Sequence, residues 1–195
     1  LTLTVAASGL TVNVTFDGIA NAFRDSYTMT EWATPEEKNY QQPSYLATSN
    51  EAADMFPTAG KVIGAELSPT PYPVTQDGDA AKIITRDTKG GFAFITVLPK
   101  STAGTLFNGE FVLNATNTLN STHFGEAFLK DTAPKTFAFT YKYTPGPTYY
   151  NTTSEGSGFN TKVTVEEVPD KVDQCSCIAY LYEVDDYSEY LDGTN

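Results

Sequence analysis

Apolar and polar residues alternate along much of the chain, which is the pattern of strands that bury one face. The strand-like stretches are separated by turn sequences rich in Gly and Pro; they are Leu1–Ala6, Leu10–Phe16, Lys61–Leu67, Ala80–Arg86, Gly91–Leu98, Gly104–Leu113, Thr136–Tyr143, Thr161–Val168 and Cys175–Val184. A 3.6-residue period is almost absent. Many short strands without helical periodicity predict an all-β fold, an antiparallel β-sandwich of the jelly-roll type.

Two of these stretches make sharper predictions. In Thr136–Tyr143 the aromatic residues share one parity, which predicts a row of rings facing the core, with Lys142 on the solvated face. The row consists of Phe137, Phe139, Tyr141 and Tyr143. Phe92–Leu98 is apolar on both parities, which predicts a strand buried on two faces.

The alternation of apolar and polar residues stops between Asp17 and Thr58. This segment is polar, contains prolines at positions 35, 43 and 57, and predicts loops with one short helical turn near Asn50–Met55. A long irregular segment in a compact domain is usually a functional loop or one packed over the core. The run Ser68–Asp79, with three prolines, predicts turns.

Length and charge narrow the function classes. The 195 residues, of 21.2 kDa, suit one large domain or two small ones. The net charge is −12, so nucleic acid and anionic membranes are unfavourable partners. No stretch approaches the roughly 20 apolar residues of a membrane span. The chain opens at Leu1 in strand-like sequence, and we interpret it as a mature or trimmed chain whose targeting segment is missing.

The sequence gives no sign of a zinc site or a cofactor. Asp77 and Asp79 could help to hold calcium, with Asp87 as a further oxygen donor, but Asp-Gly-Asp is also an ordinary turn. Cys175 and Cys177 are the only cysteines and His123 is the only histidine. Cysteines two positions apart on a strand share a face with poor disulfide geometry, so we expect two unpaired thiols in the core. A single histidine also weakens any Ser-His-Asp proposal. The sequence Asn-x-Ser/Thr occurs at Asn13, Asn114, Asn120 and Asn151, a mild excess that does not establish a glycoprotein.

The stretch from His123 to Pro145 resembles the putative carbohydrate metabolism domain of Bacteroidetes surface proteins. The family pattern there is Phe-Gly, a following Phe, a Pro and an alternating aromatic strand that ends in Tyr-Lys-Tyr. It is filled here by Phe124, Gly125, Phe128, Pro134, Phe139, Tyr141, Lys142 and Tyr143. Three further segments fit in order, namely Ala80–Thr85, Leu106–Phe111 and Asp173–Cys175. The resemblance covers about residues 16–195.

The resemblance implies a jelly-roll domain on a cell-surface, outer-membrane lipoprotein, behind an immunoglobulin-like domain. We therefore expect residues 10–195 to form the jelly roll. Residues 1–9 belong either to the last strand of the upstream domain or to the first strand of this one. Membrane attachment would come only through a missing N-terminal lipid anchor, and other cell-surface glycan-utilisation proteins would be partners. The resemblance transfers no catalytic residues.

A sugar-binding site needs flat apolar rings and nearby amides or carboxylates. The loop-like sequence between Trp32 and Tyr72 offers both. We therefore predict ligand contacts from Trp32, Tyr40, Tyr45, Asn50 and Tyr72. The competing interpretation is that Trp32 plugs one end of a sandwich. The acidic surface favours a neutral oligo- or polysaccharide.

Three functions remain open from the sequence. The first is a non-catalytic module that binds or presents a glycan, and the second is a carbohydrate-active hydrolase. The third is a structural spacer without a ligand. A hydrolase needs two carboxylates across a cleft, and Glu110 and Glu126 are the candidates because each adjoins apolar strand sequence. No concentrated acid–base constellation is visible, so the sequence favours the first and third functions.

Overall fold

The structure of the chain is a computed structural model. It describes residues 24–87, 91–93, 96–98, 101–114, 117–128, 134–156, 162–186 and 188–194. The predictions for Leu1–Ala6, Leu10–Phe16 and the domain boundary after residue 9 lie outside the described residues.

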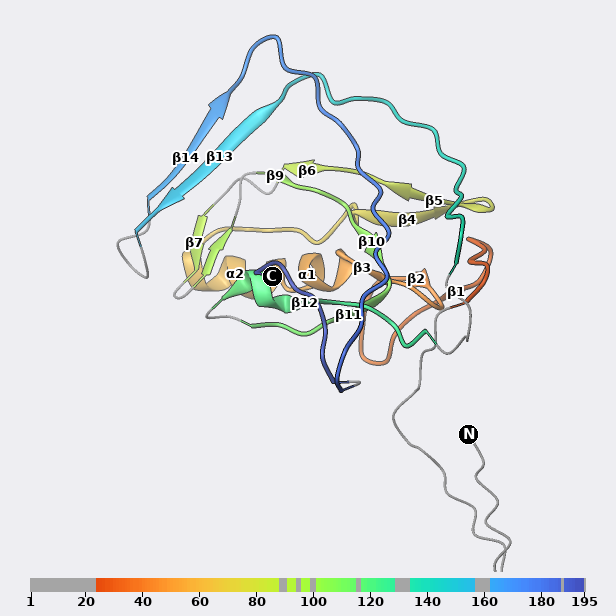
Figure 1. Cartoon of the computed structure of the whole chain (residues 1–195). Helices are drawn as coiled ribbons and strands as arrows, with labels where there is room; N and C mark the ends of the chain where they lie inside the picture. The colour runs from red at the N-terminus through yellow and green to blue at the C-terminus, as the bar shows by residue number, and fades with distance from the viewer. Residues whose placement is uncertain are drawn as a thin grey trace, which may run out of the picture.

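Short strands dominate the described chain (Figure 1). They pair antiparallel, two by two: β1 (Trp32–Ala33) with β2 (Gln42–Pro43), β3 (Ala47–Thr48) with β10 (Leu106–Phe107), β4 (Val74–Asp77) with β5 (Ala80–Ile83), β6 (Arg86–Asp87) with β9 (Ser101–Thr102), β7 (Gly91–Ala93) with β8 (Thr96–Leu98), β11 (Gly109–Phe111) with β12 (Thr122–Phe124) and β13 (Tyr150–Glu155) with β14 (Lys162–Glu167). The prediction of a β-rich chain is confirmed. Sheets of two strands do not establish a sandwich or a jelly roll.

Two short helices follow one another after β3. They are α1 (Asn50–Asp54) and α2 (Phe56–Ile63). The predicted helical turn near Asn50–Met55 is confirmed, whereas the predicted strand Lys61–Leu67 is wrong. Helix α2 contains Pro57 in its first turn, where proline is well suited. Its C-cap is Gly64, which has a φ of 69° and donates its backbone N–H to the Gly60 carbonyl.

The apolar core of the described chain lies between these helices and the segment that follows them. Ala53 and Phe56 are buried, and Ala59, Leu67 and Tyr72 pack against them. Arg86 lies over the Phe56 ring at 5.7 Å. Its guanidinium donates to the carbonyls of Ser68, Pro69 and Thr70, at 3.0, 2.6 and 3.1 Å. The proline-rich run is thereby fixed over the core.

Asn50, which has no exposed surface, joins α1 to β4 and to the chain before β2. Its Nδ2 donates to the carbonyls of Gln41 and Val74 at 2.9 and 2.7 Å. Its Oδ1 accepts from the Val74 N–H at 2.9 Å. A buried amide with these partners satisfies backbone groups that the short strands leave open.

The predicted strand Thr136–Tyr143 and its core-facing aromatic row are wrong. Residues 134–147 are extended but have no strand partner, and the row is exposed, with Phe139 at 51%. Its rings pack on one another instead, with centroids 5.5 Å apart for Phe137–Phe139 and 5.2 Å for Phe139–Tyr141. Cys175–Val184, also predicted as a strand, likewise has no strand partner, and residues 175–181 are exposed, whereas Tyr182 donates to the Phe124 carbonyl at 2.7 Å.

Two other predictions need correction. Gly91–Leu98 forms the hairpin of β7 and β8 and not one strand, since Gly91 lies opposite Leu98. Cys175 and Cys177 are free, as predicted, but they are exposed and not in the core because their segment has no covering strand.

The C-terminal segment returns to the body and docks beside β12 (Figure 1). Phe124 and Leu191 exchange backbone hydrogen bonds of 2.7 and 3.2 Å. Asn120 Nδ2 donates to Asp192 at 2.7 Å, and the Gly193 N–H donates to the Leu119 carbonyl at 2.9 Å. Within the described ranges, no helix has the length and apolar character that a membrane crossing requires.

Candidate functional site

An open groove of about 240 Å³ lies where β2 and β3 meet β11. One wall comes from the chain between Pro35 and Glu51, and the other from β11 and Glu126. The pairing of Ala47 with Phe107 brings these distant parts of the sequence together. The side chains that the argument below uses are Tyr40, Gln42, Ser44, Tyr45, Glu51, Glu110 and Glu126.

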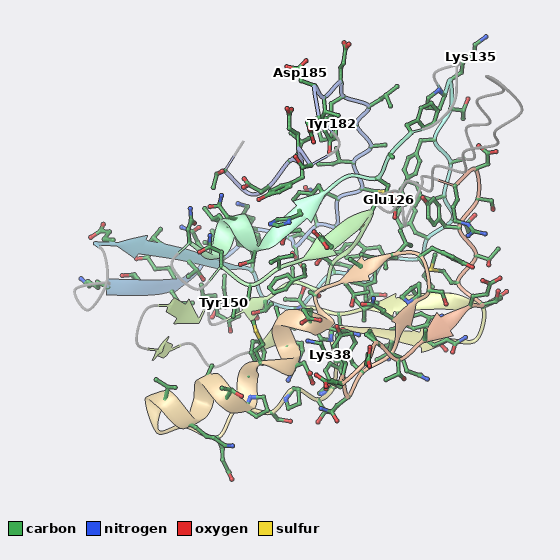
Figure 2. The ribbon with its side chains drawn as sticks, turned by 90° about the horizontal axis from the view of Figure 1, so that it is seen from below. Lys38, Glu126, Lys135, Tyr150, Tyr182 and Asp185 are labelled. Carbon is green, nitrogen blue, oxygen red and sulfur yellow. The ribbon has the colours of Figure 1, made fainter. Side chains whose placement is uncertain are left out.

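Glu126 is held in place by two neutral donors. Tyr27 OH donates to its Oε2 at 2.8 Å, and Asn108 Nδ2 donates to the same oxygen at 2.9 Å. Burial, together with the nearby Glu126 carboxylate, raises the pKa of Tyr27 to about 12, so the phenol stays protonated and keeps donating. Figure 2 shows Glu126 where the chain leaves β12.

Glu51 is held differently, by one cation and one phenol. Its carboxylate accepts from Lys38 Nζ and from Tyr40 OH. Tyr40 is only 3% exposed, and burial is the main cause that raises its pKa, followed by Glu51. Lys38 compensates the charge of Glu51, so this carboxylate adds less to the negative potential of the groove than its two neighbours do.

Glu110 is the most accessible of the three carboxylates. Its Oε1 lies 3.4 Å from Nδ1 of His123, its cross-strand partner. The imidazole stacks on Tyr190 of the docked C-terminal segment, with centroids 3.7 Å apart and an interplanar angle of 13°. The far wall of the groove therefore depends on the seating of the C-terminal segment.

Tyr45 supplies the exposed ring of the groove. It is 40% exposed, and the Arg24 guanidinium lies 3.7 Å from its centroid. A cation over one face of a phenol fixes the ring without burying it. Tyr45 therefore presents a fixed aromatic surface beside Gln42 and Ser44.

The structure brings two of the five predicted ligand residues into this groove, Tyr40 and Tyr45, but Tyr40 offers little surface. Trp32, in β1, is half-buried, and its Nε1 donates to the Met29 carbonyl at 2.8 Å. Tyr72 OH donates to Asp54 at 2.7 Å, and its ring packs on the ring of Tyr40, with centroids 5.6 Å apart. Asn50 is buried, as described above. These three residues lie outside the groove lining.

The groove also contains residues that the predicted ligand set lacks. Glu110 and Glu126, singled out from the sequence as candidate hydrolase carboxylates, both line it. Ser44 and Glu51 carried no distinguishing signal, because a turn serine and a first-turn helix glutamate are common. Across the described ranges, no three His, Cys, Asp or Glu side chains gather as a metal ion would require.

Comparison with known proteins gives one match. A family model, described as the putative carbohydrate metabolism domain, matches residues 16–195. No curated protein and no solved structure matches the chain. Because the matched region takes in nearly all of the sequence, the chain belongs to the putative carbohydrate metabolism domain family.

Proposed function

We propose that the groove between β3 and β11 binds a neutral oligo- or polysaccharide without cleaving it. The observation that carries this proposal is that one exposed ring, Tyr45, shares an open groove with positioned carboxylates and an amide. Sugars present C–H faces to aromatic rings and hydroxyl groups to polar side chains. The family to which the chain belongs supports a role in carbohydrate handling.

Glu126 is the best-placed acceptor for a sugar hydroxyl. Among the described residues, both of its hydrogen bonds end on Oε2, so Oε1 can accept from a ligand. Tyr27 and Asn108 fix the carboxylate in advance, which lowers the entropy that binding would cost. Gln42 and Ser44 supply further polar contacts from the opposite wall.

The charge of the groove favours a neutral ligand. Three carboxylates line it, and Lys38 is bound to one of them. On a chain of net charge −12, a uronate or sulfate group would meet repulsion at low salt. We expect weak binding, about 10 μM to 1 mM, because a shallow site gains only about 4–7 kcal/mol.

The test combines a broad glycan array with calorimetry on the hits. Tyr45→Ala and Glu126→Gln should each weaken binding about tenfold, since one lost stacking or hydrogen-bonding contact costs about 1.4 kcal/mol. Tyr150→Ala is the matched control, because Tyr150 is 39% exposed on β13, outside the groove lining. No binding at millimolar sugar, or equal losses in all three variants, would contradict the proposal.

Trp32→Ala and Tyr72→Ala complete the set. Both residues were predicted from the sequence to touch the ligand, and neither lines the groove. We expect their binding losses to be smaller than that of Tyr45→Ala. A larger loss for Trp32→Ala in a folded protein would place the site elsewhere on the loop segment.

A second candidate function is hydrolysis of a glycan, favoured by the presence of both Glu110 and Glu126 in one groove. Glycosidases use two carboxylates on either side of the scissile bond. Steady release of reducing sugar from an array hit, abolished by Glu110→Gln or Glu126→Gln, would move the protein into the enzyme class. Binding without release supports the first function. The absence of both binding and release supports a structural spacer.

The finer architecture and the location are part of the same proposal. We place the domain on the cell surface, as the jelly-roll part of an exported outer-membrane lipoprotein that works with other glycan-utilisation proteins. The support is the resemblance of the His123–Pro145 pattern to such proteins and the carbohydrate role named for the family. Surface labelling of intact cells tests the location.

A further inference from the structure

The short stretch of residues 24–27 lies against the groove, although none of its residues lines it. The Arg24 guanidinium covers the Tyr45 ring, 3.7 Å from its centroid, and Tyr27 OH donates to Glu126 Oε2 at 2.8 Å. Tyr45 and Glu126 belong to opposite walls of the groove. One stretch of chain therefore holds both side chains to which we assign the main sugar contacts.

The two contacts are joined within the stretch itself. The backbone N–H of Arg24 donates to Tyr27 OH at 2.9 Å, and Asn108 Nδ2 donates to the same oxygen at 2.9 Å. The phenol oxygen thus accepts two hydrogen bonds and donates one to Glu126, which is the full capacity of a hydroxyl group. Movement of Arg24 away from the groove would disturb the phenol that positions Glu126.

The stretch buries little surface of its own. Residues 24–26 are exposed, and Tyr27 is half-buried. Its contacts with groove side chains therefore weigh heavily in keeping it seated. An exposed cation–π contact and a hydrogen bond to a carboxylate are both modest in free energy, so a small change in the groove can shift the balance between the seated and released states.

We propose that occupancy of the groove and seating of residues 24–27 are coupled, so that a bound sugar holds this stretch in place. The coupling rests on the proposed function. A sugar that stacks on Tyr45 and donates to Glu126 Oε1 stabilises the orientations of the two side chains that the stretch contacts. Sugar and guanidinium can share the ring, because Tyr45 lines the groove whereas Arg24 does not. Two partners that select the same side-chain orientations strengthen each other, and the effect is reciprocal.

Trypsin measures the seating without any sugar. Arg24 is the first basic residue of the chain, so cleavage after it releases one defined peptide, residues 1–24. Trypsin takes the arginine side chain into its own pocket, which requires Arg24 to leave Tyr45. The cleavage rate then follows the population of the released state. Cleavage after Lys61, within α2, measures the stability of the domain in the same digest.

The first arm compares the full-length wild type with four variants. Tyr45→Ala should speed cleavage after Arg24 about two- to fivefold, as the loss of an exposed cation–π contact implies, whereas Tyr45→Phe keeps a ring and should stay near the wild type. Tyr27→Phe loses the bond to the carboxylate and should speed cleavage about tenfold. Tyr150→Ala, an exposed tyrosine outside the groove lining, is the matched control and should have no effect.

Two results of this arm would overturn the proposal. One is an unchanged rate after Arg24 in both Tyr45→Ala and Tyr27→Phe. The other is an equal rise in the rate after Lys61, which would trace the effect to a loss of overall stability. A rise confined to Arg24 supports the seating of the stretch on the groove.

The second arm adds four neutral probes, cellohexaose, maltohexaose, mannohexaose and xylohexaose, and calorimetry identifies those that bind. At about ten times its Kd, a bound probe should slow cleavage after Arg24 by about tenfold at most. Probes that do not bind control for effects on trypsin itself. By reciprocity, Tyr27→Phe should weaken the binding of the same probe, although Tyr27 lies outside the groove lining.

The outcomes of the second arm separate the two proposals. Binding without slower cleavage after Arg24, or with faster cleavage, would overturn the coupling and leave the proposed function standing. Binding with slower cleavage supports both. No binding by any of the four probes and none across the glycan array would overturn the proposed function and the coupling together.

Discussion

Replacing Asn50 by alanine should destabilise the domain more than the groove substitutions Tyr45→Ala and Glu126→Gln. The side chain has no exposed surface and makes three hydrogen bonds to backbone groups of Gln41 and Val74. Alanine would leave two carbonyls and one N–H without a partner in the interior. A buried polar group without a partner costs about 1–3 kcal/mol, and each bond is worth about 1 kcal/mol net.

Three such bonds give a loss of about 3–5 kcal/mol in the free energy of unfolding. A domain of this kind has a free energy of unfolding of about 5–15 kcal/mol, so the variant should keep only a small part of its stability. Urea denaturation followed by far-UV circular dichroism measures this, with the midpoint falling while the slope stays the same.

Asn151→Ala is the control, because Asn151 is an exposed asparagine on β13 and should change stability by no more than about 0.5 kcal/mol. The measurement also decides the role of Asn50. If Asn50→Ala lost less than about 1 kcal/mol but weakened glycan binding, Asn50 would be a ligand residue and the structural account would be refuted.

Two further predictions concern aromatic residues. Phe56→Ala should cost about 3–5 kcal/mol in urea melts because Phe56 is buried in the core, whereas Phe139→Ala should cost the monomer far less because its ring is exposed; the reverse order would mean that the row is core. In a spectrophotometric titration, Tyr27 and Tyr72, with pKa values raised to about 12, should ionise after the exposed tyrosines. Because the folded state holds these protons more tightly, stability should fall as pH rises from about 10 to 12, and a flat profile would contradict it.

Local signals in the sequence predicted several elements correctly. The turn at Asp77-Gly78-Asp79 closes the β4–β5 hairpin, with Gly78 at a φ of 64°, and Ala80 opens β5 as expected. The pattern of Thr161–Val168 corresponds to β14. These elements depend on neighbours within a few residues, so a single sequence contains the information.

Other elements depend on partners far along the chain. Strand β4 was missed because three prolines precede it, and only Asn50 and β5 show where its backbone bonds go. The exposed state of Phe139 depends on the absence of a facing strand, which alternation cannot reveal. The pattern of the aromatic row therefore predicts a core face whether or not a second layer covers it.

The residues of the candidate site also differ in whether local sequence could predict them. Tyr45 could be predicted, because an aromatic in a polar loop is a local signal. The Tyr27–Glu126 bond joins residues 99 positions apart, so nothing local marks Glu126 as positioned. Asn50 was predicted as a ligand residue from its type and loop setting, yet its partner Val74 lies 24 positions away and fixes it in the interior.

The seating of the C-terminal segment on Asn120 affects how the protein should be produced. Asn120-Ser121-Thr122 is an acceptor sequence for N-glycosylation, and Nδ2 of Asn120, the atom that would carry the sugar, is the atom that donates to Asp192. A eukaryotic secretory host could modify this nitrogen before folding and prevent the segment from docking. A bacterial host avoids the modification, and Thr122→Ala removes the acceptor sequence while keeping the amide.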